Sequence, residues 1–531
     1  MKKIKLILIS LGLSLGLNAQ TPFWTNTSYK GAFPITDGTP STDWTYGWSN
    51  FDPENTSYPS TTSTISSDIT SNITLSGTVL LKNKVYVTNG STLTILPGTI
   101  IRGDKSTQAT LVITKGCKII AEGTQNSPIV FTSNESVGNR TEGDWGGLVI
   151  LGLATNNQPG GVANIEGIVP SANTQYGGSN DNDNSGSLKY VRVEFGGIAL
   201  EPNKEINGIT FGSVGKETLV DYCQVSFSGD DSYEWFGGTV DCKHLIAYRG
   251  IDDDFDTDFG YRGRIQFGLI VRDPNLYDAP GDSNGFESDN DATGSSNTPQ
   301  TSAIFSNITS IGPKGNGSIT LPVGEKFEKA FRIRRNSSIS VFNSLVVGWE
   351  KGLSIEGTSC ETNATSGTLV FSNNVLTELP LGSSYVTATS GFFTPIALVN
   401  DTAKTITQVK WVNAFTSLGT KPDCRLDNTS SVATGASFTN PKFTGGFVGI
   451  NEFKQDINVT IYPNPVTNNV TITTDNKLVQ VTLIDGMGRV INTQTVSGTI
   501  SLDVTNLSNG IYFLQINDKN DLITKKILVR K

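Results

Sequence analysis

The chain has 531 residues, of which 36% are hydrophobic, 17% are charged and 56 are glycine. Lysine and arginine together number 40 against 49 aspartates and glutamates, so the formal net charge is −9. An acidic chain of this kind is a poor match for nucleic acid, and we expect no nucleic-acid partner. The many glycines and few charged residues favour a turn-rich, all-β protein, long enough for an elongated repeat body and a small second domain.

Residues 1–19 are typical of a secretory signal peptide. Three lysines within the first five residues precede an apolar run from Leu6 to Leu17, and LNA before Gln20 is a suitable cleavage site. The apolar run is too short to cross a bilayer as a stable helix. The sequence therefore predicts a secreted protein with no membrane span.

Residues 20–65 form a tryptophan-rich segment that includes YKGAFPITDGTPSTDWTYGWSNFDP. This block resembles one found in exported bacterial β-helix proteins. The open end of a β-solenoid exposes unpaired strand edges, and we expect this segment to cap such an end. Trp44 and Trp48 have a second interpretation, because exposed indole rings stack on sugars and would bind a glycan.

Residues 66–435 repeat short β-branched runs that end at glycine or Asn-Gly, as in TVLLKNKVYVTNGSTLTILPGTIIRG. Repeats of this kind stack as the coils of a solenoid. The segment resembles right-handed parallel β-helix proteins, also in DWGGLVILGLA, and the resemblance implies the same fold here. We therefore predict an all-β chain whose body is a right-handed parallel β-helix.

A register is visible in the middle of this body, where SYEWFGG and DFDTDFG align with a shift of 22 residues. The shift predicts an inward apolar column of Tyr233, Phe255, Phe286, Phe331 and Leu353. The neighbouring outward column contains Glu234, Asp256, Glu287, Arg332 and Ser354. A second strand in each coil is predicted to stack Leu245, Phe267, Phe305, Phe342 and Phe371.

The stretch GIDDDFDTDFGYRG, residues 250–263, concentrates aspartates that the same register places beside the acids of the preceding coil. Calcium prefers six to eight oxygen ligands, which stacked carboxylates supply. The predicted calcium ligands are Asp230, Asp231, Glu234, Asp252, Asp254, Asp256 and Asp258. Without a metal these carboxylates would raise each other's pKa, and Arg249, Arg262 and Arg264 are alternative neutralising groups. A solvated acidic loop is the third interpretation.

The aspartates also allow a catalytic interpretation. SGDDS, residues 228–232, resembles the paired-aspartate motif of polygalacturonase-type glycoside hydrolases, which are β-helices as well. The resemblance implies an acid and a base among Asp230, Asp231 and Asp253. The Gly-His-Gly block of those enzymes has no counterpart, since the single histidine, His244, stands in CKHLI and is expected to be structural. A lyase that uses calcium and an arginine base stays open.

The cysteines are odd in number, and none stands in a CxxC motif that would indicate a zinc site. In an exported protein one or two disulfides would form readily, but small buried residues are the favoured interpretation. They are Cys117, Cys223, Cys242, Cys360 and Cys424.

Residues 436–455 are predicted to be a linker, and residues 456–531 a small antiparallel β-sandwich, because apolar and polar residues alternate between turn signals. The blocks IYPNPVTNNVTI, VTLIDGMGRVI, LDVTNLSNGIYFLQI and KKILVRK follow one another there. They resemble the type A C-terminal sorting domain of the type IX secretion system. The resemblance implies the type IX secretion machinery as a partner, and export to the outer cell surface or the medium.

Taken together, these patterns predict a secreted or cell-surface β-helix protein with a binding, adhesion or structural role. An extracellular glycan or a cell-surface ligand would be its partner, and calcium is the one cofactor that the sequence suggests. The alternative is a polysaccharide-degrading hydrolase or lyase of the β-helix type.

Overall fold

The structure is a computed structural model of the chain, and it describes residues 23–39, 42–201, 204–315, 319–377, 385–387, 400–414, 422–432, 434–444, 459–474, 479–485, 490–517 and 522–531. The chain divides into two compact units, with the division between Thr439 and Asn440. The predicted signal peptide and residues 445–455 of the predicted linker lie outside the described residues. Within the described ranges, no helix combines the length and the apolar character needed to cross a membrane.

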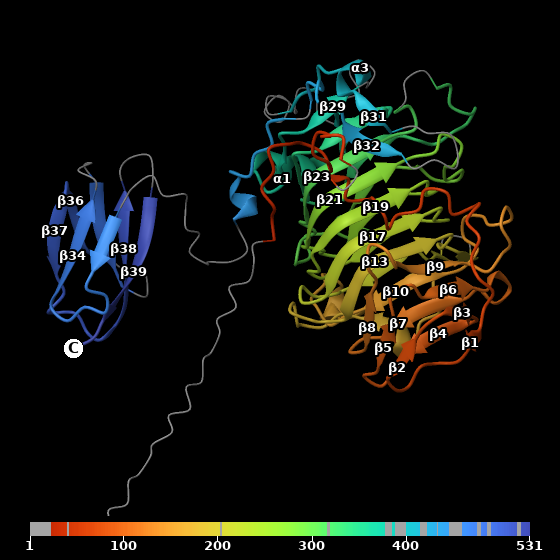
Figure 1. Cartoon of the computed structure of the whole chain (residues 1–531), viewed down its shortest axis with the longest axis horizontal. Coiled ribbons are helices and arrows are strands. Elements are labelled where there is room, and N and C mark those ends of the chain that lie inside the picture. Colours follow the sequence, from red (N-terminus) through yellow and green to blue (C-terminus); the bar gives the residue numbers. More distant parts are fainter. Residues whose placement is uncertain are drawn as a thin grey trace, which may run out of the picture. The chain divides into compact units, whose positions relative to one another are not determined.

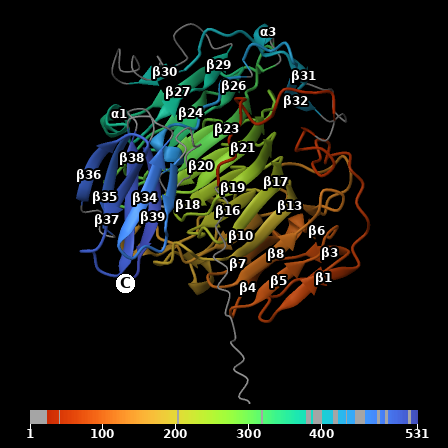
Figure 2. The same ribbon diagram turned by 60° about the vertical axis from the view of Figure 1, so that its left-hand side comes forward.

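One face of the first unit is a parallel sheet of ten strands, to which each successive coil contributes one strand (Figure 2). In chain order these strands are β4 (Lys84–Val87), β7 (Thr110–Ile113), β10 (Gly147–Leu151), β16 (Ile209–Gly212), β18 (Tyr233–Phe236), β20 (Phe255–Asp258), β22 (Phe286–Ser288), β24 (Lys329–Ile333), β27 (Lys351–Ile355) and β30 (Tyr385–Thr387). Residues far apart in the sequence thereby become neighbours at the same height of adjacent strands.

A larger parallel sheet supplies two further faces (Figure 1). One begins with β1 (Ser63–Ile65), β3 (Thr78–Leu81), β6 (Ile100–Gly103) and β9 (Ile129–Ser133), the other with β2 (Ile73–Leu75), β5 (Thr92–Ile95) and β8 (Lys118–Glu122). Strand β13 (Gly186–Glu194) joins them, because its first half pairs with β8 and its second half with β9. The stack continues through β17 (Leu219–Ser226), β19 (Cys242–Tyr248), β21 (Arg264–Val271) and β23 (Ile304–Ile311), and then through β25 (Ser340–Phe342), β26 (Leu345–Val347), β28 (Phe371–Ser372) and β29 (Val375–Thr377).

Three faces of short parallel strands around an apolar interior make the body a parallel β-helix, which confirms the predicted fold. Small elements decorate it: the antiparallel pairs β11 (Ala163–Asn164) with β12 (Gln175–Tyr176), β14 (Ala199–Glu201) with β15 (Lys204–Glu205), and β31 (Trp411–Asn413) with β32 (Asp423–Leu426), and the helices α1 (Thr358–Thr365) and α3 (Ile406–Val409). All five cysteines are buried, and none of them is part of a disulfide bond.

The long strands turn a corner at one residue each, where φ is positive. At four consecutive corners the rings stack, with centroids 4.5 Å apart for Tyr190 and Tyr222, 4.2 Å for Tyr222 and His244, and 4.9 Å for His244 and Phe267. The Nδ1 atom of His244 lies 2.7 Å from a carboxylate oxygen of Asp221. The only histidine therefore sits inside an aromatic stack at a corner of the coil.

The predicted apolar column from Tyr233 to Leu353 is confirmed by the strand register. The second predicted column is wrong, because Leu245 pairs with Gly268. The aligned residues there are Ile265, Phe305, Val341 and Phe371. Phe267 is a corner residue with a φ of 66°, and this positive φ interrupts the two-residue alternation on which the prediction relied.

The tryptophan-rich segment runs along the side of the coils (red in Figure 1). The prediction had placed it over an open end of the β-helix. The Thr25 N–H donates to Gln266 of β21 at 2.8 Å, and the Asn50 N–H donates to Gln224 of β17 at 2.9 Å. The Tyr58 hydroxyl contacts Glu194 of β13 at 2.8 Å. We call residues 23–39 and 42–58 the strap, because they fasten consecutive coils laterally.

The second unit has two antiparallel sheets that share one apolar core, as the sequence predicted. One sheet contains β33 (Val459–Tyr462), β34 (Asn469–Thr474) and β37 (Thr499–Asp503), and the other β35 (Val479–Ile484), β36 (Val490–Val496), β38 (Gly510–Asn517) and β39 (Leu522–Val529). Val470, Ile472, Val481, Leu483 and Leu514 are buried between them.

Candidate metal centre

Acidic side chains line the outward side of the ten-stranded sheet. The register pairs Glu234 of β18 with Asp256 of β20, and Asp256 with Glu287 of β22. Side chains alternate along a strand, so Tyr233, next to Glu234, fills the interior and has no exposed surface. The next member of the outward column is Arg332. The predicted outward column is therefore confirmed, and its carboxylates end at an arginine.

A second column stands at the turn before these strands. The Oδ1 atom of Asp231 accepts a hydrogen bond from the Asp253 N–H at 2.9 Å, and Oδ1 of Asp253 accepts one from the Asn284 N–H at 2.6 Å. Oδ1 of Asn284 in turn accepts from the Lys329 N–H at 3.2 Å. Short Asp and Asn side chains suit this bonding to nearby backbone. This repeat, here called the Asx ladder, uses one oxygen of each side chain to satisfy an amide of the next coil.

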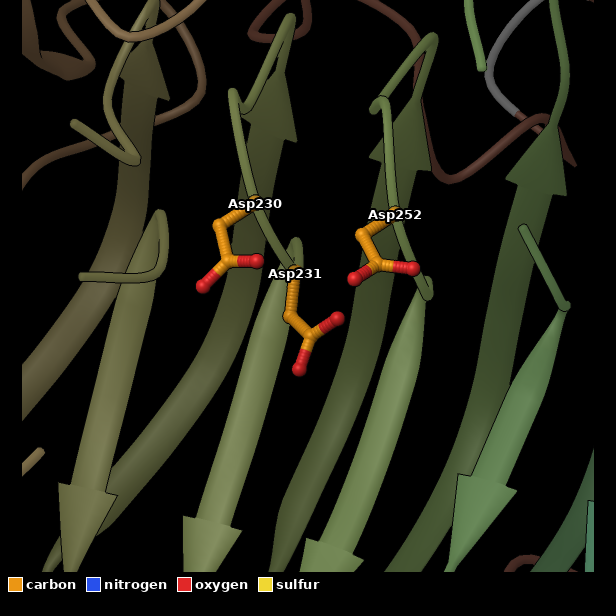
Figure 3. A group of neighbouring side chains, drawn as sticks. All are labelled: Asp230, Asp231 and Asp252. Atoms are coloured by element: carbon orange, nitrogen blue, oxygen red, sulfur yellow. The ribbon is translucent and has the colours of Figure 1, made fainter. Parts of the chain in front are cut away.

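The two columns bring seven carboxylates into three overlapping groups. In each group, one oxygen per residue lies within 4.8 Å of the others. The first group is Asp230, Asp231 and Asp252 (Figure 3), the middle group is Asp231, Glu234 and Asp256, and the third group is Asp253, Asp256 and Glu287. Asp231 and Asp256 each belong to two groups, so the carboxylates form one continuous chain across three coils.

Burial is the main reason why the carboxyl groups of the middle group have raised pKa values. For Asp231 the charges of Asp230 and Asp256 add to the effect of burial. The pKa of Asp256 is raised by burial and then by Glu234. Two unit charges 4.8 Å apart repel each other by about 3 kcal/mol at an effective dielectric constant near 20. The middle group therefore favours a bound proton or a bound cation over three bare charges.

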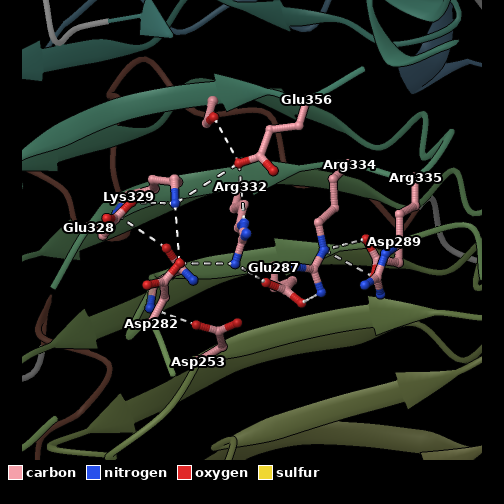
Figure 4. Close-up of polar contacts among 12 residues, drawn as sticks. Asp253, Asp282, Glu287, Asp289, Glu328, Lys329, Arg332, Arg334, Arg335 and Glu356 are labelled. Carbon is pink, nitrogen blue, oxygen red and sulfur yellow. Dashed lines mark hydrogen bonds and ion pairs between the residues drawn. The ribbon is translucent and has the colours of Figure 1, made fainter. Parts of the chain in front are cut away.

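Arginines neutralise the third group and its surroundings (Figure 4). Arg332 Nη1 lies 3.1 Å from Glu287 Oε2, and Arg334 pairs with both Glu287 and Asp289. Arg335 pairs with Asp289 at 2.7 Å. Burial nevertheless raises the pKa of Glu287 to about 8, assisted by Asp253 and opposed by these arginines.

The middle group has no such cations. Among the residues that the structure describes, no ion pair joins a lysine, an arginine or the histidine to Asp231, Glu234 or Asp256. The arginines that the sequence suggested as neutralising groups pair elsewhere: Arg249 with Asp273 at 3.2 Å, Arg262 with Asp181 at 2.8 Å and Arg264 with Asp241 at 2.5 Å. The prediction that they offset the acidic cluster is wrong.

Asp254, a predicted calcium ligand, lies apart from all three groups. Its carboxylate is 2.8 Å from Nε of Arg272, and both side chains are completely buried. Burial raises the pKa of Asp254 to about 8, against the opposing charge of Arg272. Arg272 also donates to the backbone oxygens of Gly250, Asp252 and Asn284, so it ties the acidic turn to the next coil. The turn before β20 reverses the direction of the Asp254 side chain, which strand alternation alone would place outward.

Two further predicted assignments change in the structure. Asp258 is outside the three groups, and its carboxylate accepts the Phe259 N–H at 2.6 Å. The predicted catalytic trio is also divided: Asp230 and Asp231 meet Asp252 in the first group, whereas Asp253 belongs to the third.

Comparison with known families agrees with this architecture. A family model described as a pectate-lyase-like β-helix domain matches residues 65–417, well over half of the chain. The chain belongs to this family. A second model, the secretion system C-terminal sorting domain, matches residues 460–530 of this pectate-lyase-like protein. The sorting domain indicates handling by the type IX secretion machinery and export to the cell surface or the extracellular space.

Outside this family, the similarities of the pectate-lyase-like protein are distant. No curated protein matches it. Among solved structures, the full-length tailspike protein 2 of Escherichia coli O157:H7 bacteriophage CAB120 is 12% identical, with a TM-score of 0.27. The match covers 85% of this chain and 64% of the tailspike chain, so the present protein spans less than two thirds of that neighbour.

The tryptophans of the pectate-lyase-like protein do not form the sugar platform that the sequence allowed. Trp48 has no exposed surface and packs edge-on against Tyr190 and Tyr222 of the corner stack. Trp44 is partly buried, stacks on Phe33 with centroids 5.2 Å apart, and donates its indole N–H to Ala32 O at 2.9 Å. Trp48 thus fastens the strap to the coils, and Trp44 meets the corner stack at His244, with ring centroids 5.2 Å apart.

Sequence reasoning missed Asn207 and Asn284 as parts of this site, and considered Arg272 only as a candidate base of a lyase, beside Arg262 and Arg264. A signal for the first two is present, since Asn207, Asp231, Asp253 and Asn284 each stand two residues before the first residue of a strand. An Asp or Asn at a fixed distance before four consecutive strands indicates a side chain that repeats one role in every coil. The position of Arg272 inside the coil had no comparable pattern.

Proposed function

We propose that this exported pectate-lyase-like protein binds Ca²⁺ in the middle group and serves outside the cell as a binding or adhesion protein. Its partner would be an extracellular glycan or a cell-surface ligand. The observation that carries the calcium part is the composition of the middle group: two buried carboxylates and one partly buried carboxylate on two adjacent coils, with no ion-paired cation among the described residues.

The spacing of the oxygens suits one calcium ion. Calcium binds six to eight oxygens at about 2.4 Å, so two oxygens that share an ion are at most about 4.8 Å apart. The oxygens of Asp231, Glu234 and Asp256 fall within 4.8 Å of one another. Bound Ca²⁺ would attract the three carboxylates that otherwise repel one another, and would link the two coils that carry β18 and β20.

Calorimetric titration of CaCl₂ into the full-length protein, after treatment with a chelator, tests this proposal. We expect one saturable site, and a rise in the unfolding temperature when calcium replaces the chelator. At ten times the dissociation constant the stabilisation would be about 1.4 kcal/mol. The variants Glu234→Gln and Asp256→Asn should lose most of the heat of binding.

Asp282→Asn is the matched control, because Asp282 pairs with Arg332 and stands outside all three groups. It should keep the calcium affinity of the unmodified chain. An unmodified protein with no calcium heat and no thermal shift would refute the calcium site. The ligand is tested by binding of labelled protein to immobilised glycans, with calcium and with chelator.

Glycoside hydrolysis is the second candidate, favoured by the first group. Asp231 is buried with a raised pKa between Asp230 and Asp252, which is the environment of a general acid beside a base or nucleophile. Oligosaccharide release from polygalacturonate, lost in Asp231→Asn, would establish the hydrolase. Equal product formation by that variant would exclude this assignment of the acid.

A further inference from the structure

Asn207 occupies the ladder position one coil before Asp231. The Gly208 N–H donates to Asp231 O at 2.9 Å, and Ile209 of β16 pairs with Tyr233 of β18. The side chains of Asp231, Asp253 and Asn284 all use Oδ1 to accept an amide of the next coil. Asn207 is the member of this series whose side chain behaves differently.

The Oδ1 atom of Asn207 is buried without a hydrogen-bond partner among the described residues. The residue is only 3% exposed, so water does not compensate freely for the missing bond. Its Nδ2 atom instead donates to Glu234 Oε2 at 2.5 Å and to Thr210 Oγ1 at 3.3 Å. The Asn207 amide is therefore held against the middle group while its oxygen is left for another ligand.

The placement of this oxygen follows from covalent geometry. Oδ1 and Nδ2 are bonded to the same carbon, and Nδ2 touches the carboxylate of Glu234. Oδ1 is therefore no farther from Glu234 Oε2 than the width of the amide plus this hydrogen bond, and Asn207 stands at the position of its coil that corresponds to that of Asp231 in the next. A neutral amide oxygen beside carboxylates is a common part of calcium sites.

We propose that Asn207 Oδ1 is the neutral ligand of the cation in the middle group, and that it gives the site its preference for Ca²⁺ over Mg²⁺. This inference rests on the proposed calcium function. Asn207 and the three carboxylates of the middle group come from three adjacent coils and would together offer the cation up to seven oxygens. Mg²⁺ requires a compact octahedron at 2.0–2.1 Å and gives up its water reluctantly, whereas Ca²⁺ accepts a wider and more irregular shell.

Two variants of the full chain test the role of Asn207 by calorimetry with Ca²⁺ and, separately, with Mg²⁺. Asn207→Ala removes the oxygen, and we expect the calcium dissociation constant to rise at least tenfold. Asn207→Asp keeps an oxygen and adds a charge, so calcium affinity should be retained within threefold or improve, while the preference over Mg²⁺ decreases. Asn156→Ala is the control, because Asn156 is equally buried but bonds to Gly161 and Ser213.

Calcium binding by Asn207→Ala with the affinity of the unmodified chain would overturn the inference and leave the calcium site itself intact. If Asn207→Ala does not fold, Asn207→Asp decides, since a loss of more than tenfold in that variant contradicts an oxygen ligand at this position. Failure of the calcium site as a whole would be recognised separately, because then the unmodified protein binds no calcium.

Discussion

Replacing Arg272 by methionine should destabilise the body strongly, because Asp254 and Arg272 form an ion pair that is completely buried. Breaking such a pair by removal of one partner costs about 3–5 kcal/mol. At pH 7 the carboxyl group of Asp254 is mostly protonated in the parent as well, because its pKa is about 8. Above pH 8 the parent releases this proton, whereas the variant has to keep it at a cost of about 1.4 kcal/mol for each further pH unit. Backbone oxygens of Gly250 and Asn284 that lose their donor add a cost that does not depend on pH.

The sign of the pH effect follows from the direction of the shift. In Arg272→Met the folded-state pKa of Asp254 lies far above the unfolded value, so stability is present at low pH and is lost as the pH rises. Because the pKa of Asp254 is about 8 in the parent, we expect the difference in unfolding free energy between variant and parent to be similar at pH 5 and pH 7, and about 1.4 kcal/mol larger at pH 9 than at pH 7.

Urea unfolding followed by tryptophan fluorescence measures this change. All seven tryptophans, from Trp24 to Trp411, lie in the first unit, so the signal reports the body alone. Arg262→Met is the control, because its partner Asp181 is 43% exposed and the pair contributes at most about 1 kcal/mol. A loss below 1 kcal/mol in Arg272→Met, or an equal loss at pH 7 and pH 9, would refute the reasoning.

Other predictions concern the ladder, the acids, the strap and export. Asp231→Ala should lower the unfolding free energy by about 1–3 kcal/mol, because the backbone amide of Asp253 loses its acceptor. Asp231→Asn should lower it much less, because asparagine still accepts this hydrogen bond, and equal losses in urea unfolding would argue against the ladder. When a chelator removes calcium, the body should become more stable as the pH falls from 7 towards 5, because the folded-state pKa values of Asp231 and Asp256 are raised. An unfolding free energy that does not change with pH would contradict this. Trp48→Ala should cost about 3–5 kcal/mol, whereas Tyr46→Ala, at a residue 48% exposed, should change stability by at most about 0.5 kcal/mol. Deletion of residues 456–531 should retain the protein in the periplasm, and normal surface or medium levels in a fractionation experiment would count against the sorting role.

The sequence predicted those parts of the fold that depend on local periodicity. Tyr233 and Phe255 stand in the same place of consecutive coils, and the two-residue alternation of a strand is enough to assign them to the interior. The same rule failed at Phe267, where a corner with positive φ resets the alternation. The course of the strap was also beyond prediction, because its contacts join residues such as Thr25 and Gln266 that only the folded coil brings together.

The outline of the candidate site was also predictable from the periodicity of the coils. A shift of one coil was sufficient to place Glu234 beside Asp256, and the acids around them therefore clustered as expected. The direction of Asp254 depends on the turn before β20, and the contribution of Asn207 depends on which of its two amide atoms meets Glu234. Neither is fixed by residue type or spacing, so both required the folded chain.

The register across the acidic turn has an evolutionary consequence. Tyr233 and Phe255 are 22 residues apart, whereas Phe255 and Phe286 are 31 apart, yet both pairs are aligned in adjacent strands. Extra residues are accommodated between β21 and β22 without moving Asp256 relative to Glu287. Loops at this turn can therefore lengthen, shorten or be exchanged between relatives while the neighbouring carboxylates keep their places. A new ligand preference would require only a different loop beside an inherited acidic face, and the same turn is a suitable place to insert a foreign peptide for display outside the cell.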